Sequence, residues 1–349
     1  VPATALFPSG STGHPQIVVH TLANHLYSAM GSAINLPIES DDRWLIMLPL
    51  SHVSGLSILF RCLIAGATAL IARSGSLRDD DALDLLPQVT RLSLVPAQLQ
   101  RLLEIPKDRF RNLRSVLVGG QAASPLLIRR AQEAGIPVMT TYGSTEMASQ
   151  VTTTAPEGRV QPGACGTVLP YRRLRVHDGE IEVGGRTLFS GYLTPTGIKK
   201  PALRSGSWFQ TGDYGYLNAS GVLTVTGRAD AMFVSGGENI QPQEIEAILT
   251  EHPAIAVAVV VPAPDIEFGT RPVAFIEPRA NDYGFVMPPE VELQQLLASR
   301  LARFKHPVRY YRMPVSSLDQ PDDLGDSAVI SKPNRAQLTI MARREAEKI

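Results

Sequence analysis

The chain has 349 residues, 44% of them hydrophobic, with 33 basic and 33 acidic side chains and a formal net charge of zero. The hydrophobic content excludes a disordered chain, and the length favours a large domain followed by a smaller one. Because the basic residues are scattered rather than clustered, neither nucleic acid nor an anionic membrane surface is expected as a partner.

The first 150 residues alternate between apolar runs and helical patterns. Short apolar runs bounded by turn residues are typical of buried parallel strands. Four such runs lie at 44–50, 67–72, 92–95 and 115–118. Helical spacing is found at 97–104 and at 125–135, and the second segment begins with proline and ends with glycine. Strands that alternate with helices predict a doubly wound α/β layer.

From about residue 160 to residue 228, the sequence changes to short strand patterns separated by glycine turns. Two examples are 174–184 (LRVHDGEIEVG) and 221–227 (GVLTVTG). This pattern predicts a small β-rich subdomain that packs on the sheet.

The pattern changes once more after Asp230. An amphipathic helix is expected at 240–251, and two strands are expected at 254–261 and 273–276. We therefore predict a large α/β domain over residues 1–229 and a small α+β domain over residues 230–349.

Two further observations concern the cellular compartment. Cys62 and Cys165 are the only cysteines, so neither a disulfide framework nor a zinc site is indicated. No apolar run approaches the roughly 20 residues that a membrane-spanning helix needs, and the first residues lack the pattern of a signal peptide. These features predict a cytoplasmic protein without a membrane span.

The stretch FPSGSTGHPQ, from Phe7 to Gln16, is dense in glycine and hydroxyl residues. Backbone N–H groups and hydroxyls that point into one concavity hold phosphate oxygens, so this loop is a candidate phosphate site. It is not a Walker A loop, because no Gly-Lys-Ser/Thr follows. Taken alone, the segment is equally compatible with an exposed turn.

Two other segments carry carboxylates beside turns. Thr145 and Glu146 end the run YGSTE, which follows a predicted strand at 138–141, and such a pair suits Mg²⁺ or a phosphate oxygen. Asp213 ends the run WFQTGD, where it is expected after a tight turn as an acid that binds ribose hydroxyls. Singly, the first segment also fits a helix start and the second a hairpin.

The order of these segments is more specific than any one of them. The phosphate loop, YGSTE, GY at 191–192, WFQTGD, GRAD at 227–230 and SGGENIQPQEIE at 235–246 together resemble the ANL adenylate-forming superfamily of acyl-CoA ligases. The resemblance implies the fold of that superfamily, in which a large α/β domain with a β-rich subdomain precedes a small mobile α+β domain. It also implies an additional N-terminal segment before the phosphate loop, and this sequence lacks it.

The resemblance implies nucleotide contacts for residues in these loops and at these strand ends. They are Ser9, Gly10, Ser11, Thr12 and Gly13 for the ATP β- and γ-phosphates, Gly119, Gly120, Gln121 and Tyr142 for adenine, and Asp213 and Arg228 for the ribose. Thr145 and Glu146 are implied as catalytic contacts to the α-phosphate and Mg²⁺, with Glu146 as the metal ligand.

The small domain is implied to supply three further functions. Asp230 matches the hinge about which this domain turns, and Gly236 and Gly237 would leave space for the pantetheine arm of CoA. Lys332 begins a Lys-x-x-Arg-x-x-Leu pattern and matches the catalytic lysine, which compensates charge in the adenylation transition state. The usual preceding glycine is missing and Pro333 follows directly, so a surface lysine in a polar loop is the other interpretation.

The acyl substrate is indicated by the run PLSHVSGL followed by Phe60-Arg61. Arg61 falls about two helical turns after Ser54, so both side chains can face one pocket. A buried arginine is costly unless it pairs with an anion, so the acid is expected to carry a second carboxylate. His52 is either a substrate contact or an ordinary core histidine.

This segment resembles, within the superfamily, the o-succinylbenzoate–CoA ligases of menaquinone biosynthesis. The resemblance implies that Arg61 pairs with the second carboxylate, Ser54 donates a hydrogen bond to it, and His52 lines the aromatic or carbonyl portion of the substrate. The implied reaction consumes ATP with Mg²⁺ and CoA, and it forms o-succinylbenzoyl-CoA through an acyl-AMP intermediate, with release of AMP and pyrophosphate.

Two alternatives stay open at this point. One is a CoA ligase for another aryl or dicarboxylic acid. Another is a weakened or non-catalytic nucleotide-binding homologue, which is suggested by Gln16 at the position where the superfamily commonly has lysine. Exposed sheet edges would also favour a homo-oligomer.

Overall fold

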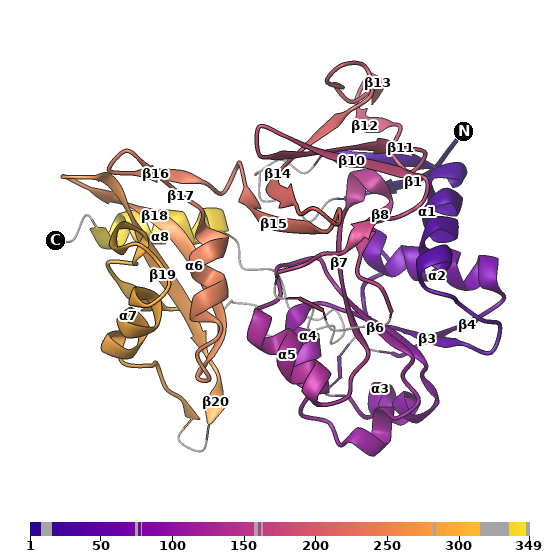
Figure 1. Cartoon of the computed structure of the whole chain (residues 1–349), viewed down its shortest axis with the longest axis horizontal. Helices are drawn as coiled ribbons and strands as arrows, with labels where there is room; N and C mark the ends of the chain where they lie inside the picture. The colour runs from indigo at the N-terminus through magenta and orange to yellow at the C-terminus, as the bar shows by residue number, and fades with distance from the viewer. Residues whose placement is uncertain are drawn as a thin grey trace. The chain divides into compact units, whose positions relative to one another are not determined.

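The computed structural model describes residues 1–7, 16–73, 76–77, 79–156, 160–161, 163–281, 284–314 and 335–346. The chain divides into two compact units, one from Val1 to Val225 and one from Thr226 to Ile349 (Figure 1). The division lies close to the boundary predicted between residues 229 and 230.

The first unit contains a seven-stranded sheet in the order β4-β3-β5-β6-β7-β8-β9. The strands are β3 (Arg43–Ile46), β4 (Thr68–Ile71), β5 (Arg91–Leu94), β6 (Ser115–Val118), β7 (Val138–Ser144), β8 (Ser149–Thr153) and β9 (Thr167–Val168). The strands from β4 to β7 are parallel, and β8 and β9 pair antiparallel. All four predicted strands are present. The first is shorter than predicted, because it ends before Pro49, which has no N–H to donate to a neighbouring strand.

Helices cover both faces of this sheet. They are α1 (Leu22–Asn35), α2 (Val53–Ala65), α3 (Asp80–Leu85), α4 (Pro96–Leu102) and α5 (Pro125–Glu133), with 3₁₀ turns at Leu86–Gln88, Lys107–Phe110 and Thr145–Met147. The alternating side chains of β3 show the two layers: Leu45 belongs to the core shared with α4 and α5, whereas Trp44 packs with Ile58 of α2. The predicted doubly wound layer is confirmed.

Two smaller sheets form the β-rich part of this unit. One has the order β1-β2-β12-β13 and the other β10-β11-β14-β15. Their strands are β1 (Pro2–Leu6), β2 (Ile17–Thr21), β10 (Arg172–His177), β11 (Glu180–Gly185), β12 (Gly191–Thr194), β13 (Gly197–Lys199), β14 (Phe209–Leu217) and β15 (Leu223–Arg228). Asp213 lies inside β14, so its predicted place after a tight turn is wrong. The strand continues because a register shift between Glu180 and Glu182 of β11 accommodates it.

The second unit is an α+β domain around the sheet β18-β19-β22. Its strands are β16 (Phe233–Ser235), β17 (Glu238–Ile240), β18 (Ile255–Asp265), β19 (Gly269–Pro278), β20 (Ala280–Asn281), β21 (Gly284–Phe285) and β22 (Tyr310–Arg312). Its helices are α6 (Pro242–Leu249), α7 (Glu290–Ala298) and α8 (Arg335–Ala346), with a 3₁₀ turn at Arg303–Lys305. Among the described residues, no helix of either unit is long and apolar enough to cross a membrane.

Candidate functional site

The carboxyl ends of β6 and β7 bring together predicted contacts to a nucleoside. Gly119 directly follows β6, and its N–H donates to the carbonyl of Leu94 at 3.2 Å. On the neighbouring strand β7, the hydroxyl of Tyr142 donates to Asp213 Oδ2 at 2.6 Å. Tyr142 is 9% exposed and Asp213 7%. The proposed adenine contact and the proposed ribose contact are therefore joined by one short hydrogen bond.

The YGSTE segment forms a tight hairpin between β7 and β8. Residues Thr145–Met147 make one 3₁₀ turn, after which β8 runs back antiparallel, with Ser144 opposite Ser149. Gly143 is required in this hairpin, because a Cβ there would lie 2.1 Å from the Ser149 carbonyl oxygen. The hairpin holds Thr145 and Glu146 at its tip, beyond the carboxyl end of the parallel sheet.

Glu146 is half-buried and accepts a hydrogen bond from a neighbouring strand. The hydroxyl of Tyr192, in β12, donates to Glu146 Oε1 at 3.2 Å. Burial, and then the nearby carboxylate of Glu146, raise the pKa of Tyr192 above its ordinary value, so this tyrosine stays a hydrogen-bond donor at neutral pH. The sequence singled out Gly191-Tyr192 as a motif without assigning it a role.

The tip of the hairpin fits the needs of a magnesium ion bound together with phosphate. Among the described residues, no three side chains of His, Cys, Asp or Glu gather as a metal cluster. Mg²⁺ in nucleotide sites commonly uses one or two carboxylates, with phosphate and water oxygens completing its shell. Tyr192 occupies one of the about four acceptor positions that the Glu146 carboxylate offers. Glu146 and the Thr145 hydroxyl could hold such an ion.

The side chain of His20, in β2, supports the same tip through a hydrogen bond. Its Nε2–H donates to the carbonyl of Thr145 at 2.8 Å, and its ring lies 4.9 Å from that of His25 in α1. Both histidines are almost completely buried. Burial lowers the pKa of each ring to about 4, and at His25 the neighbouring His20 lowers it further. Both rings are therefore neutral near pH 7.

Arg61, in α2, reaches this hairpin from the other side. Its side chain is 2% exposed, its Nη2 donates to Ser149 Oγ at 3.2 Å, and its guanidinium lies 5.4 Å from the ring centroid of Trp44. Its Nε is buried and has no hydrogen-bond partner among the described residues. Burial lowers the pKa of Arg61 to about 10, so the side chain still carries its charge at neutral pH.

A second buried arginine lies close to Arg61. Arg172, in β10, donates to the carbonyls of Gln150 at 2.7 Å and of Ser28 at 2.9 Å. Burial, and then the charge of Arg61, lower its pKa to about 9. In the described part of the chain, neither guanidinium forms an ion pair with a carboxylate. Two buried positive charges without a negative partner favour an anion nearby.

The predicted acyl segment has a different local structure from the one expected. His52 is not at the end of a strand, because β3 ends at Ile46, and it is instead the N-cap residue of α2. Ser54 lies in the first turn of α2, where its carbonyl accepts from Ser57 Oγ at 3.0 Å. Both His52 and Ser54 are half-buried, seven to nine residues before Arg61 on the same helix.

The predicted small-domain residues lie near the start of the second unit. Arg228 pairs with Asp230 through two contacts, Nε to Oδ1 at 2.8 Å and Nη2 to Oδ2 at 3.1 Å, so the proposed ribose contact and the proposed hinge residue hold each other. Gly236 and Gly237 form the turn between β16 and β17 with φ angles of 57° and 86°. Glycine adopts such angles without strain.

Some predicted residues lie outside the described residues. These are the phosphate-loop residues 9–13 and Lys332. The later members of the lysine's pattern are described: Arg335 pairs with Glu246 at 2.8 Å, and Leu338 is buried in the core beneath α8. Gly120 and Gln121 follow Gly119 in the described loop before α5, and Gln121 is exposed.

Sequence reasoning missed several residues of this site. They are His20, Ser57, Ser149 and Arg172, whereas Tyr192 stood in a motif that was given no role. Ser149 follows Glu146 by three residues, and only the tertiary structure places it against α2. An arginine in the apolar helix VSGLSILFRCLIA indicated a polar partner, but no local pattern distinguishes Ser149 from the many other hydroxyl residues.

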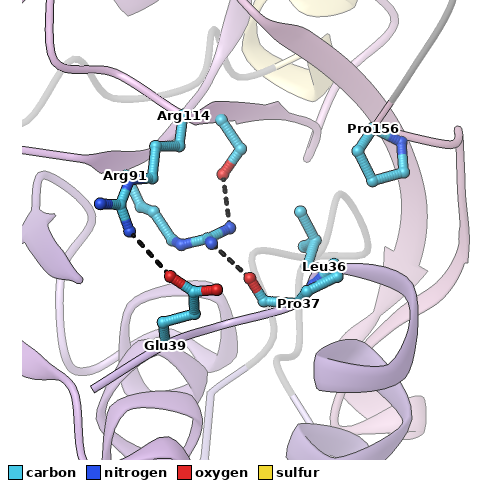
Figure 2. Close-up of a pocket in the computed structure, with 7 residues that line it drawn as sticks. Leu36, Pro37, Glu39, Arg91, Arg114 and Pro156 are labelled. Atoms are coloured by element: carbon cyan, nitrogen blue, oxygen red, sulfur yellow. Dashed lines mark hydrogen bonds and ion pairs between the residues drawn. The ribbon is translucent and has the colours of Figure 1, made fainter. Parts of the chain in front are cut away.

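A cavity of about 240 Å³ lies at the opposite, amino end of the parallel sheet (Figure 2). It is lined by Leu36, Pro37, Glu39, Arg91, Arg114, Ser115 and Pro156. Arg91, at the start of β5, pairs with Asp42 at 2.6 Å, and Arg114 pairs with Asp41 at 2.8 Å. Because nearby carboxylates already pair with both arginines, this cavity is a poor anion site.

Comparisons with known proteins agree with this geometry. Residues 1–193 match the family described as AMP-binding enzyme, and residues 244–319 match the AMP-binding enzyme C-terminal domain. The chain is 38% identical over 322 residues to a 2-succinylbenzoate–CoA ligase of Bacillus pumilus, with 88% of this chain and 64% of the relative covered. This chain thus spans slightly less than two thirds of the length of that relative.

Two solved structures of one enzyme are also similar. The o-succinylbenzoate coenzyme A synthetase of Bacillus subtilis in complex with the acyl-adenylate intermediate has a TM-score of 0.79 at 34% identity, covering 96% of this chain and 68% of that one. Its complex with ATP and a magnesium ion has a TM-score of 0.77 at 34% identity, covering 96% and 69%.

The first family model matches more than half of the chain. The chain therefore belongs to the AMP-binding enzyme family, and it has the adenylate-forming fold that its motif order predicted. The resemblance to the ANL superfamily is confirmed.

Proposed function

We propose that this chain is the adenylating and thioester-forming part of an AMP-forming acid–CoA ligase. The observation that carries this proposal is the carboxyl end of β7. There Tyr142 is bonded to Asp213, and three residues later the hairpin tip presents Thr145 and Glu146. A nucleoside contact and a metal–phosphate contact on one strand end suit a bound ATP.

The proposed nucleotide site uses the residues that the motifs predicted. Tyr142 and Asp213 bind the nucleoside, and Glu146 with Thr145 binds the metal and the α-phosphate. When bound, Mg²⁺ supplies positive charge against the phosphate oxygens. The protein's own contribution is to fix Glu146 through Tyr192 and to orient the tip through its backbone contacts.

The proposed acid is o-succinylbenzoate, which is converted to o-succinylbenzoyl-AMP and then to the CoA thioester. The similar proteins are named as ligases for that acid, and one of them was solved with its acyl-adenylate bound. In this chain, support comes from the buried positive charges of Arg61 and Arg172, which favour a substrate with a second carboxylate. Another dicarboxylic aryl acid is the alternative that the same charges allow.

The second half-reaction is proposed to use the second unit. Gly236 and Gly237 are proposed to let a narrow chain such as pantetheine pass the turn between β16 and β17. The space beside Gly237 is open, whereas a Cβ on Gly236 would lie 2.6 Å from the ring of Phe268. Lys332 is proposed to compensate charge during adenylation, and Asp230 to serve as the hinge. Gln16 replaces the usual lysine of the phosphate loop, and it is proposed to weaken ATP binding without changing the reaction.

Mass spectrometry of the reaction products tests this proposal. The chain is incubated with ATP, Mg²⁺ and CoA, together with either o-succinylbenzoate or benzoate. Acyl-AMP and acyl-CoA are expected with o-succinylbenzoate and not with benzoate. The matched control is Lys332→Ala, which removes the proposed transition-state charge. Nucleotide binding without either product, for every acid tested, would favour the non-catalytic homologue instead.

A further inference from the structure

The turn after Glu146 is held in an unfavourable backbone conformation. Ala148 has a φ of 52° and Ser149 a φ of 102°, and neither residue is glycine. Such angles are strained for a residue with a side chain, and they persist only where the surroundings impose them. Contacts from outside the hairpin must therefore hold the tip that carries Thr145 and Glu146.

Three carbonyls of the turn accept hydrogen bonds from other elements. The Glu146 carbonyl accepts from the N–H of Phe189 at 2.8 Å, and the Ala148 carbonyl accepts from Ser28 Oγ at 2.6 Å. The Thr145 carbonyl accepts from His20 Nε2 at 2.8 Å. The histidine contact is the one on the residue directly before Glu146.

The partner of His20 fixes the position of its proton. A carbonyl oxygen can only accept, so the neutral ring carries its hydrogen on Nε2. Its Nδ1 is buried and has no partner among the described residues. The backbone of β2 anchors this side chain. The ring of His25 lies 4.9 Å from it and stacks in parallel on Phe60 of α2 at 4.6 Å.

We propose that His20 is a positioning residue for adenylation: its Nε2–H holds the Thr145 carbonyl, and through it the Thr145–Glu146 tip, in the geometry that binds the metal and the α-phosphate. This inference rests on the proposed function of the same site. The hydrogen bond of His20 goes to the backbone carbonyl of Thr145 and not to the side chain of Thr145 or Glu146. Its effect is exerted through the backbone of the turn.

Replacement of His20 by two residues of similar length separates the hydrogen bond from packing. The amide nitrogen of glutamine takes the place of Nε2, so His20→Gln keeps the donor, whereas His20→Leu removes it. We expect His20→Leu to lower kcat for acid-dependent ATP–pyrophosphate exchange about ten- to hundredfold. His20→Gln is expected to stay within about threefold of the parent chain, with KM for the acid unchanged in both variants.

His25→Leu is the matched control. This histidine is equally buried and lies in the same cluster, but its Nε2 bonds to Thr4 Oγ1 at 2.8 Å and not to the hairpin. It is expected to lower the melting temperature as His20→Leu does, while keeping kcat within about twofold of the parent. Equal losses of kcat in His20→Leu and His25→Leu, or equal activity of His20→Leu and His20→Gln, would overturn the proposal.

A second measurement separates this inference from the proposed function and needs no substrate. Hydrogen exchange at the amides of Phe189 and Ala148, which bond to Glu146 and Thr145, reports the order of the tip. In His20→Leu we expect exchange at both amides to be about tenfold faster than in His20→Gln. Unchanged exchange contradicts the inference even if the parent chain proves inactive. If His20→Leu does not fold, His20→Asn, whose amide is too short to reach the carbonyl, replaces it in both measurements.

Discussion

Two buried arginines at opposite ends of the parallel sheet have different surroundings. Arg91, which lines the cavity at the amino end (Figure 2), is 5% exposed. It pairs with the carboxylate of Asp42 at 2.6 Å. Arg61, at the carboxyl end, is 2% exposed and has only a serine hydroxyl and an aromatic ring as described partners. A buried charge that the protein itself neutralises serves structure, whereas one that it leaves without a counterion is suited to a ligand.

The wider surroundings follow the same contrast. At the amino end, Asp42 also accepts a hydrogen bond from Thr90 Oγ1 at 2.7 Å. Burial raises the pKa of the Asp42 carboxyl, but the hydrogen bonds from the Glu39 N–H, Thr90 and Arg91 together bring this pKa below its ordinary value. At the carboxyl end, the hairpin after β7 contains strained residues and is held by hydrogen bonds to its carbonyls. The amino end is stabilised by ion pairs within the protein, and the carboxyl end is the one proposed to bind the substrates.

The largest expected effect comes from Arg91→Met. This change removes the buried partner of Asp42 and leaves only Arg114, whose Nη1 lies 3.1 Å from Asp42 Oδ1. We therefore expect the free energy of unfolding to fall by about 3 kcal/mol, the lower end of the cost of breaking a buried ion pair, as measured by urea denaturation. The control is Arg91→Met combined with Asp42→Asn, which removes both charges and should restore part of the loss. A loss below about 1 kcal/mol in the single variant would show that the two ends of the sheet do not differ as proposed.

Arg61→Met should have the opposite profile. Because it removes a charge that has no buried counterion, we expect the free energy of unfolding to stay within about 1 kcal/mol of the parent value or to rise. In contrast, kcat/KM for o-succinylbenzoate should fall about a hundredfold in the exchange assay. An equal fall for benzoate, if benzoate reacts at all, would mean that Arg61 supports the hairpin through Ser149 and does not recognise the second carboxylate.

A smaller effect is expected from Gln16→Lys, which adds a positive charge directly before β2. Its side chain is expected to lie near the departing pyrophosphate, so KM for ATP should fall about threefold to tenfold. Gln16→Met is the control, because it has a similar length and no charge. If neither KM for ATP nor the exchange rate changes with lysine, the substitution in the natural loop has no functional cost.

The sequence predicted the layers of the fold more reliably than the contacts of the site. Apolar runs such as 115–118 predict a buried strand from local composition alone, and this strand has the predicted bounds. Side-chain contacts such as Arg61 to Ser149 join residues 88 positions apart, and no local pattern contains them. Asp213 was predicted at a turn because the glycine before it reads as a turn locally, whereas pairing with β11 continues the strand.

Motif order placed Thr145 and Glu146 at a strand end, but it could not supply the residues that hold them there. His20 and Tyr192 lie on two strands of another sheet, β2 and β12, which pair with each other. Their contacts to the hairpin depend on how that sheet packs against β7. The motifs thus predicted the residues of the candidate site, whose roles stay proposals, but not the residues that support them.

The smallest expected effect concerns the strain at the tip. Ala148 has a φ of 52°, where glycine has no steric penalty, so Ala148→Gly should relieve strain in the folded state. The gain is partly cancelled by the greater freedom of glycine in the unfolded chain, and we expect a net rise of about 0.5 kcal/mol in the free energy of unfolding. The matched control is Ala134→Gly, at the end of α5, where φ is −73° and glycine should only destabilise. If Ala148→Gly raises stability and at the same time lowers the rate of ATP–pyrophosphate exchange, the strained conformation is part of the site. A rise in both would show instead that the strain is incidental to adenylation.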